Sequence, residues 1–479
     1  MAKAPPRFVC NECAAVTTKW AGKCETCGAW NSIAQEEPQA ASVLAKGAAG
    51  RRIQFVGLGG MADPPPRIAS GIAELDRVLG GGFVPGSAVL LAGDPGIGKS
   101  TLLLQAATAL SRSGRRVVYV SGEESVDQIR LRGRRLDVAH AKLDLAATIN
   151  LRDILATLQA ETDVGLVVID SIQTMWLDNI ESAPGSVTQV RAAAFELIRL
   201  AKDKNFAVVL VGHVTKEGAI AGPRVLEHMV DAVLYVEGDR GHQVRILRGV
   251  KNRFGATDEI GVFEMTETGL AEVANPSALF LAERRGNVAG NAVFAGLEGT
   301  RPVLVEVQCL LAPNAAGTPR RSVVGWDSGR LGMLLAVLDT RCGLRLGGSD
   351  VYLNVAGGLR IGEPAADLAV AAALASAATE TPAQADMVFF GEVGLSGEVR
   401  QVAQAEARLK EAQKLGFAAA CMPRRVARGN RKLAAPEGIQ LVEIGHLGDL
   451  VARFSGKPAN RPAEGVGTGG RTGDIRPSS

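Results

Sequence analysis

The sequence predicts an α/β protein in which parallel β-sheets are covered by helices, preceded by a small cysteine-rich module. Short apolar, β-branched runs alternate with helical patterns from residue 68 onward, which is typical of a parallel sheet buried on both faces. A glycine-rich loop between one such run and a helical pattern has the form of a phosphate-binding loop. Cysteines are concentrated in the first 27 residues, which indicates a separate module at the N-terminus.

Length and composition indicate a globular protein with several domains. The chain has 479 residues, and a prior of roughly 150 residues per domain suggests about three units. A content of 47% hydrophobic and 22% charged residues excludes wholesale disorder. The net charge is only +3, so nucleic-acid binding would have to come from local basic loops. Without a signal peptide or a long apolar run, we expect a cytoplasmic protein that does not enter a membrane.

The order of these patterns gives the expected domains. We expect a Cys₄ zinc finger at 1–33, a linker rich in Ala, Gly and Pro at 34–66, a nucleotide-binding domain at 67–268, a second α/β domain at 269–455, and a disordered tail at 456–479. The buried parallel strands of the nucleotide-binding domain are predicted at 88–92, 117–120, 166–169, 207–211 and 232–236.

Four cysteines form a candidate zinc site. Cys10 and Cys13 make one Cys-x-x-Cys knuckle, and Cys24 and Cys27 make another ten residues later. This spacing lets two tight turns present four thiolates tetrahedrally to Zn²⁺. The alternative is a pair of disulfides or redox dithiols, which two knuckles in a reducing cytosol disfavour. Zinc here would be structural, because four cysteines leave no open coordination position, and its binding would supply the folding free energy of the module.

The glycine-rich loop matches the pattern G-x-x-x-x-G-K-[ST] that binds nucleotide phosphates. It follows the apolar strand 88–92 and precedes the helical pattern 102–110, which is the context that this motif requires. Lys99 would reach the β- and γ-phosphates of ATP, and the Ser100 hydroxyl would coordinate Mg²⁺. The predicted ATP-binding residues are Gly93, Asp94, Pro95, Gly96, Ile97, Gly98, Lys99, Ser100 and Thr101.

Acidic residues follow two other predicted strands. Asp170 ends the apolar strand 166–169, as a Walker B aspartate does, and would support Mg²⁺; the alternative is a carboxylate that caps the next turn. Glu123 follows the strand 117–120, where an acid at the carboxyl edge of the sheet could polarise the attacking water. Glu124 is an equal candidate for this role, and simple solvation of both residues is the remaining alternative.

These motifs resemble those of a known family. The lead-in that begins at Ser70, followed by the phosphate loop and by Ser-Gly-Glu-Glu, resembles the RecA-like ATPase core. Within that superfamily, the pentapeptide Lys251-Asn-Arg-Phe-Gly, the segment Gly212-His-Val-Thr-Lys216 and the Cys₄ finger are similar to the bacterial RadA family of recombination and repair proteins. The resemblance covers nearly the whole chain up to the tail.

The resemblance implies a ring that acts on DNA. It places Lys251 and Arg253 at a subunit boundary, near nucleotide held by the next protomer, where they would act as catalytic cations in the manner of an arginine finger. A basic hairpin on the surface is the alternative. The loops 176–191 and 215–227 resemble DNA-facing loops, which makes Lys216 and Arg224 candidate phosphate contacts. The partners implied are single-stranded and branched DNA, a RecA-type recombinase, and further copies of the chain in a hexameric ring.

The region 269–455 resembles the proteolytic domain of Lon without its catalytic pair. Alignment on its landmarks puts Ala365 at the position of the nucleophilic serine and Arg408 at that of the activating lysine. Alanine has no nucleophilic oxygen and arginine is effectively never deprotonated, so a structural role is expected. Basic residues between 424 and 432 form a patch that could contact phosphates or simply be solvated.

The leading hypothesis is therefore an ATP-hydrolysing motor that moves on single-stranded DNA and drives branch migration or unwinding in recombinational repair. One alternative is an ATPase switch that times protein association without DNA translocation. The other is an ATP-dependent protease, which Ala365 and Arg408 disfavour. The sequence leaves open the translocation polarity, the partner of the zinc finger and the stability of the ring without DNA.

Overall fold

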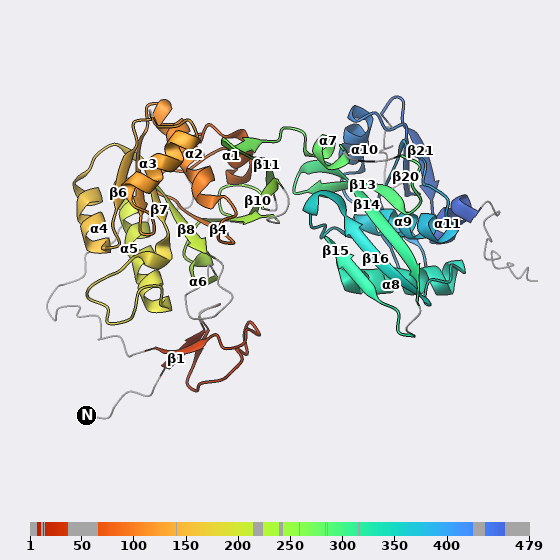
Figure 1. The fold of residues 1–479 in the computed structure, drawn as a ribbon, viewed down its shortest axis with the longest axis horizontal. Helices are drawn as coiled ribbons and strands as arrows, with labels where there is room; N and C mark the ends of the chain where they lie inside the picture. The colour runs from red at the N-terminus through yellow and green to blue at the C-terminus, as the bar shows by residue number, and fades with distance from the viewer. Residues whose placement is uncertain are drawn as a thin grey trace, which may run out of the picture. The chain divides into compact units, whose positions relative to one another are not determined.

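The computed structural model describes residues 7–10, 13, 15–36, 66–139, 141–213, 224–238, 243–257, 259–282, 284, 286–314, 317–424 and 436–455. The chain divides into two compact units, shown in Figure 1. The first comprises Met1–Leu279 with Leu297–Val303 and Gly357–Leu359, and the second comprises Phe280–Gly296, Leu304–Ala356 and Arg360–Ser479. The predicted linker 34–66 and tail 456–479 lie almost wholly outside the described residues.

The cysteine-rich module is a small antiparallel sheet. Its strands are β1 (Arg7–Cys10), β2 (Val16–Thr17) and β3 (Ile33–Glu36), in the order β2-β1-β3. The buried residues at its centre are Cys10, Cys24 and Ile33, with a few half-buried apolar neighbours. Such a core is too small to hold a fold together, so the module depends on what its cysteines bind.

A nine-stranded sheet organises the rest of the first unit, in the order β12-β11-β10-β9-β4-β8-β7-β5-β6. The strands from β9 to β6 are parallel, and β10, β11 and β12 extend the sheet in antiparallel fashion. All five predicted strands are present. The bounds are β4 (Ala88–Gly93), β5 (Arg116–Ser121), β6 (Asp144–Ala147), β7 (Val164–Asp170), β8 (Ala207–His213), β9 (Ala232–Glu237), β10 (Val244–Asn252), β11 (Ile260–Thr266) and β12 (Gly269–Glu272).

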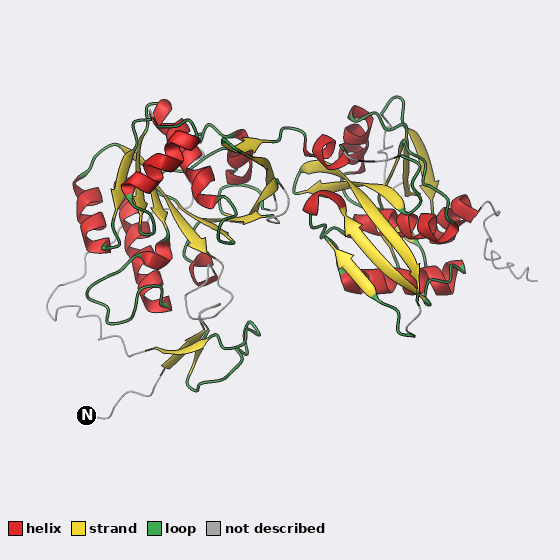
Figure 2. Ribbon diagram, viewed as in Figure 1, coloured by secondary structure: helices red, strands yellow, loops and turns green. Residues whose placement is uncertain are grey.

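Helices cover both faces of this sheet, as Figure 2 shows. Alternate residues of the parallel strands contribute to two separate cores: Leu90 and Leu210 belong to one, whereas Val89 and Val209 belong to the other. The first core is closed by α4 and α5, and the second by α1, α2 and α3. The helices are α1 (Ala73–Leu79), α2 (Lys99–Arg112), α3 (Val126–Arg135), α4 (Leu151–Ala160), α5 (Val187–Lys204) and α6 (Arg224–Glu227).

Two segments have boundaries in the structure that differ from those expected from the sequence. The predicted DNA-facing loop 176–191 ends earlier, because α5 begins at Val187 with Ser186 as its cap, so Arg191 lies on a helix. The buried side chain of Gln189 also bonds the backbone of Leu177 on both its N–H and C=O sides, which ties the loop to the helix. In addition, β12 pairs with β11, so the first unit extends beyond the expected boundary at residue 268.

The second unit is built on a seven-stranded sheet in the order β15-β16-β14-β13-β17-β20-β21. Its strands are β13 (Asn291–Glu298), β14 (Arg301–Pro313), β15 (Arg321–Val324), β16 (Ser349–Val355), β17 (Met387–Phe389), β20 (Ala419–Pro423) and β21 (Gln440–Ile444), with a separate hairpin of β18 (Glu392–Val393) and β19 (Val399–Arg400). The helices after residue 275 are α7 (Pro276–Leu281), α8 (Ser328–Cys342), α9 (Asp367–Thr379), α10 (Ala405–Lys414) and α11 (Leu447–Ser455). Among the described residues, no helix combines the length and apolar character needed to span a membrane.

Candidate functional site

The phosphate loop joins β4 to α2 and keeps its lysine inside the loop. Lys99, the first residue of α2, donates hydrogen bonds to the carbonyl oxygens of Gly93 (2.8 Å) and Asp94 (2.9 Å). Burial lowers the pKa of Lys99 to about 8, although the carboxylates of Asp170, Glu123 and Asp94 oppose the shift. A triphosphate would supply the negative charge that a buried ammonium favours, so this loop fits the predicted ATP phosphates.

Glycine is required at two points of the loop because neighbouring strands pass close by. A Cβ atom at Gly93 would lie 2.6 Å from the carbonyl oxygen of Val236 in β9. At Gly98, where φ is +117°, a Cβ atom would lie 3.1 Å from the terminal methyl of Met265 in β11. The loop is therefore enclosed by the parallel strand β9 and by β11 of the antiparallel extension.

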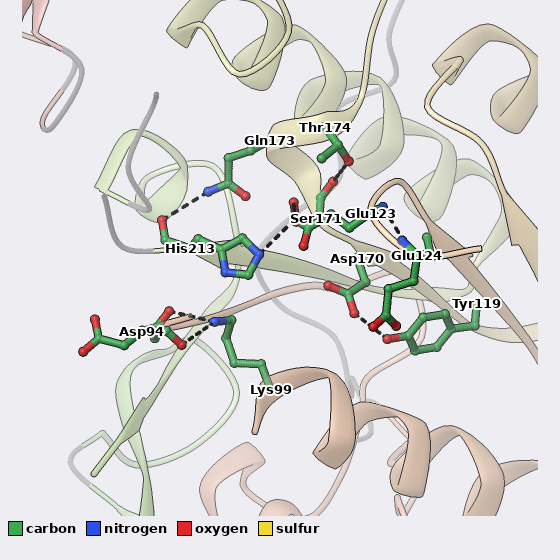
Figure 3. A network of polar contacts seen from close by, with 12 residues as sticks. Asp94, Lys99, Tyr119, Glu123, Glu124, Asp170, Ser171, Gln173, Thr174 and His213 are labelled. Carbon is green, nitrogen blue, oxygen red and sulfur yellow. Dashed lines mark hydrogen bonds and ion pairs between the residues drawn. The ribbon is translucent and has the colours of Figure 1, made fainter. Parts of the chain in front are cut away.

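The carboxyl edge of the sheet brings Asp170 and Glu123 to the same place, as Figure 3 shows. Strands β5 and β7 are neighbours, so residues that end them meet at one edge. Tyr119 donates a hydrogen bond of 2.5 Å to Oδ2 of the buried Asp170. Within the described residues no hydrogen bond to Oδ1 of Asp170 is present, which leaves this oxygen for Mg²⁺ or one of its waters.

Glu123 is held by two side chains at the carboxyl ends of other strands: Ser171, directly after β7, and His213, the last residue of β8. Ser171 donates a hydrogen bond of 2.5 Å to its Oε1, and Nε2 of His213 lies 3.0 Å from the same oxygen. The hydrogen bond from His213, supported by Ser171 and by the charge of Lys99, lowers the pKa of Glu123 to about 2 although burial opposes it. Glu123 is therefore a carboxylate at neutral pH, the form that can accept a proton from water.

Glu124, the alternative candidate, is engaged elsewhere. Its carboxylate forms an ion pair with Arg132 of α3. The peptide N–H groups of Glu123 and Glu124 both donate to the hydroxyl of Ser121, which fixes the backbone while the two side chains diverge. The geometry thus favours Glu123, not Glu124, as the acid that faces the phosphate loop.

Sequence reasoning gave no role to His213, Ser171 or Tyr119, although each touches a predicted site residue. His213 ends β8, which pairs with the phosphate-loop strand β4. Its place at the carboxyl end of a predicted strand was the one sequence feature that could have indicated a role at the site. Within the described chain, the buried Nδ1 of His213 and Oε1 of Gln173 have no hydrogen-bond partner. A ligand or water is the usual partner of such atoms at a site.

Lys251 and Arg253 lie at the end of β10, and both contact their own chain. The ammonium of Lys251 donates to the carbonyl oxygens of Glu227 (2.6 Å) and Val230 (2.8 Å). Arg253 lies 3.3 Å from Asp231, but its side chain is 57% exposed. Of these two cations, Arg253 is the more accessible to a second copy of the chain, and the role of both across a subunit boundary stays a prediction.

The two candidate DNA contacts differ in what the structure says of them. Lys216 lies outside the described residues. Arg224 begins the short helix α6 and is exposed to solvent. In the predicted basic patch of the second unit, the described residues include Arg424 and omit 425–435.

The four cysteines predicted to bind zinc converge. Their sulfur atoms all lie within 4.8 Å of one another, with Sγ–Sγ distances of 3.7 Å between Cys10 and Cys27 and between Cys13 and Cys24. No cysteine is in a disulfide among the described residues, so the alternative of two disulfides is not what the fold adopts. Four thiols at this separation match the tetrahedral sulfur set that Zn²⁺ prefers.

The second unit has no hydrolytic pair at the predicted positions. Ala365 is 1% exposed, and the fully buried Arg408 forms an ion pair with Glu363. Arg408 also donates to the carbonyl oxygens of Ala295 (2.7 Å) and Ala403 (3.1 Å). Arg408 thus contacts Glu363, two residues before Ala365, and its guanidinium is occupied by an ion pair and backbone carbonyls instead of acting on a nucleophile.

Comparison with family models assigns three regions of the chain. Residues 8–35 match a rubredoxin metal binding domain, residues 63–219 match an AAA domain, and residues 336–426 match subunit ChlI of Mg-chelatase. The fold class predicted from the sequence, a Cys₄ module, a parallel-sheet ATPase core and a second α/β domain, is confirmed by the structure and these matches.

Full-length relatives are more similar. The DNA repair protein RadA of Brucella abortus (strain 2308) is 58% identical over 471 residues, which cover 96% of this chain and 100% of the relative. That of Bacillus subtilis (strain 168) is 48% identical over 462 residues, covering 94% and 99%.

Among solved structures, the RadB recombinase is similar to part of the chain. It matches with a TM-score of 0.35 and 24% identity, over 43% of this chain and 99% of that chain. The assignment to a family comes from the sequence relatives instead. With relatives of this identity aligned over their full length, the chain belongs to the RadA family of DNA repair proteins.

Proposed function

We propose that the chain is an ATP-hydrolysing DNA motor that promotes branch migration of recombination intermediates during DNA repair. The observation that carries the proposal is the convergence of Lys99, Asp170 and Glu123 at the carboxyl edge of one parallel sheet. A cation for the phosphates, an acid for the metal and a carboxylate base are the three groups that hydrolysis of a nucleoside triphosphate needs.

The residues of the site divide the steps of ATP hydrolysis among them. The peptide N–H groups of the loop 93–101 bind the phosphates, and Lys99 leaves its carbonyl partners to contact the β- and γ-phosphates. Ser100 and Asp170 would hold Mg²⁺, which would supply positive charge against the transferred phosphoryl group. Glu123 orients the attacking water and accepts its proton, while Ser171 and His213 fix the carboxylate.

The DNA assignment rests on the family. Relatives that align with 87–96% of this chain carry the name DNA repair protein RadA. We propose single-stranded and branched DNA as substrates, Lys216 and the exposed Arg224 as phosphate contacts, and a RecA-type recombinase as a protein partner in the cytoplasm. The functional unit is a homo-oligomer, a hexameric ring, in which Lys251 and Arg253 approach the nucleotide of the next copy.

ATP turnover with and without single-stranded DNA tests this function. The wild-type protein should hydrolyse ATP, and an unstructured oligonucleotide should raise the rate several-fold. Glu123→Gln should lower kcat by about 10²-fold or more while ATP binding is kept, because only the base is lost. Glu124→Gln is the matched control one residue away, and it should keep most of the activity because Glu124 pairs with Arg132.

Each outcome separates the alternatives. ATP turnover that DNA does not change would favour a switch that controls protein association over a DNA motor. Equal losses in Glu123→Gln and Glu124→Gln would remove the assignment of the base. An absence of ATP hydrolysis in the wild-type protein under all DNA conditions would overturn the proposed function as a whole.

A further inference from the structure

The phosphate loop is held from outside by an arginine that none of the nucleotide motifs includes. Arg245, the second residue of β10, donates a hydrogen bond of 3.1 Å from Nε to the carbonyl oxygen of Ile97, in the middle of the loop. Arg245 is 6% exposed and Ile97 is 3% exposed, so the contact is buried. The residues are 148 positions apart in the sequence, which is why motif spacing gives no sign of it.

The direction of this bond fixes a donor of the phosphate cradle. The peptide between Ile97 and Gly98 is trans, so its carbonyl and its N–H point in opposite directions. Because the Arg245 guanidinium binds the carbonyl, the N–H of Gly98 is turned away from that guanidinium. Gly96 and Gly98 have positive φ values of 77° and 117°, so the backbone on each side of Ile97 would otherwise have unusual freedom.

Arg245 is itself held firmly enough to act as a support. Strand β10 is paired on both sides, with β9 and with β11, so its backbone has little freedom. Nη1 of Arg245 donates to the carbonyl oxygen of Val244 at 2.8 Å. A Cβ atom at Gly238 would lie 2.9 Å from Cδ of Arg245, which shows how closely the chain packs around the side chain.

We propose that Arg245 is a positioning residue for the nucleotide phosphates: its guanidinium holds the Ile97–Gly98 peptide in the orientation that presents the Gly98 N–H to them. This inference rests on the proposed binding of ATP, but not on DNA or on the ring. In this proposal Arg245 touches neither the nucleotide nor the attacking water. It should therefore stabilise the bound phosphates equally in the ground state and in the transition state. Its loss should therefore raise KM and leave kcat nearly unchanged.

A pair of near-isosteric variants tests the hydrogen bond itself. In Arg245→Gln the side-chain amide nitrogen stands at the same number of bonds from Cα as Nε, so the donor is kept. In Arg245→Met a methyl group stands there and the donor is lost. We expect Arg245→Met to bind ADP and a non-hydrolysable ATP analogue about tenfold more weakly than the wild type, the change expected from one lost hydrogen bond, and Arg245→Gln to stay within about threefold.

Calorimetric titration of purified full-length protein with each nucleotide and Mg²⁺, without DNA, gives these affinities, and thermal unfolding checks the fold. Arg248→Met is the matched control: Arg248 lies on the same strand but pairs with Glu237 and Glu298, so its loss should lower the melting temperature without changing nucleotide affinity. Should Arg245→Met fail to fold, Arg245→Lys, with a methylene in place of Nε, takes its place in the comparison.

The proposal is overturned if Arg245→Met, or Arg245→Lys in its place, binds both nucleotides as the wild type does. It is overturned equally if Arg245→Gln loses as much affinity as Arg245→Met, or if Arg248→Met weakens binding to the same degree. Failure of the wild-type protein to bind any nucleotide would instead overturn the proposed function. The two failures are therefore distinguishable in one set of titrations.

Discussion

The hydroxyl of Tyr119 donates a hydrogen bond of 2.5 Å to the carboxylate of Asp170 on the neighbouring strand. Burial, reinforced by the charge of Asp170, raises the pKa of Tyr119 well above its ordinary value, so the phenol keeps its proton and remains a donor. One oxygen of Asp170 is thus held in place while the other stays available at the edge of the sheet. This preorganises the carboxylate for a metal ion.

Replacing Tyr119 by phenylalanine should therefore weaken the use of Mg²⁺. We expect the Mg²⁺ concentration for half-maximal ATPase activity to rise several-fold in Tyr119→Phe, because the carboxylate loses its orientation. Chemical denaturation should show a loss of about 1–3 kcal/mol in the free energy of unfolding, since a buried acceptor loses its partner. A Mg²⁺ titration that superimposes on that of the wild type would contradict the role given to Tyr119.

ATP binding should depend on pH through Lys99. Its pKa is lowered to about 8 by burial, and the arrival of the phosphates should raise it again. Above pH 8 the free protein has partly lost this proton, so binding must take it up and the apparent affinity should fall as the pH rises. Calorimetry at about pH 8.5 in two buffers of different ionisation enthalpy measures the uptake. Equal heats in both buffers would be evidence against this assignment.

Arg253 should act on the nucleotide of a neighbouring copy. Arg253→Ala should bind ATP nearly normally, because the phosphate loop is intact, but hydrolyse it slowly. Mixing it with Lys99→Ala, which retains Arg253, should restore part of the activity, because one protein donates its cation to the intact site of the other. Lys99→Ala alone is the inactive control.

A mixture that demonstrably exchanges subunits and yet regains no activity would contradict the trans role. Arg253 would then be reassigned to its contact with Asp231 in the same chain. Unfolded Arg253→Ala protein would point to the same conclusion, since the ion pair would be needed for the fold itself.

Removing zinc should unfold the first module and spare the nucleotide-binding core. The module's own buried cluster, in the part that the structure describes, consists of Cys10, Cys24 and Ile33, whereas the nucleotide-binding core has extensive apolar layers. A chelator or Cys24→Ser should release the metal, measured by elemental analysis, with little change in the main thermal transition. One equivalent of tightly bound zinc in Cys24→Ser would contradict the four-cysteine site.

The second unit should have no peptidase activity. Unfolded casein should stay intact with the protein and ATP, and Ala365→Ser should not change this, because Arg408 cannot serve as a base. Arg408→Ala should instead destabilise the unit by several kcal/mol in denaturant unfolding, since it leaves Glu363 without its cation. Cleavage of casein by the wild-type protein would reverse the assignment.

The sequence predicted those parts of the site that depend on local pattern. The phosphate loop and its strand could be predicted because both signals, the glycine spacing and the apolar run, lie within a short stretch of sequence. The four cysteines could be predicted for the same reason, since the spacing of metal ligands is also a local pattern. The choice between Glu123 and Glu124 could not be predicted, because it depends on Arg132 in α3, on Ser171 after β7 and on His213 at the end of β8.

Longer-range relationships escaped the sequence for the same reason. The contact of Arg245 with Ile97 joins strand β10 to the phosphate loop between β4 and α2, and no periodicity encodes it. The loop 176–191 was expected from the resemblance to DNA-facing loops, and that resemblance does not fix where the loop ends. The structure begins α5 at Val187, where the buried Gln189 binds the preceding loop.

The ion pair of Arg408 and Glu363 limits which single substitutions the second unit can accept. Replacing either residue alone with an apolar one leaves the other charge without its counterpart beside the buried side of α10, which destabilises the fold. A lysine at 408 would keep a cation beside Glu363 but lose the guanidinium's hydrogen bonds to the carbonyl oxygens of Ala295 and Ala403. Paired with the carboxylate of Glu363, its ammonium would favour the protonated form and would make a poor general base. A nucleophile at position 365 would therefore gain little from that single change.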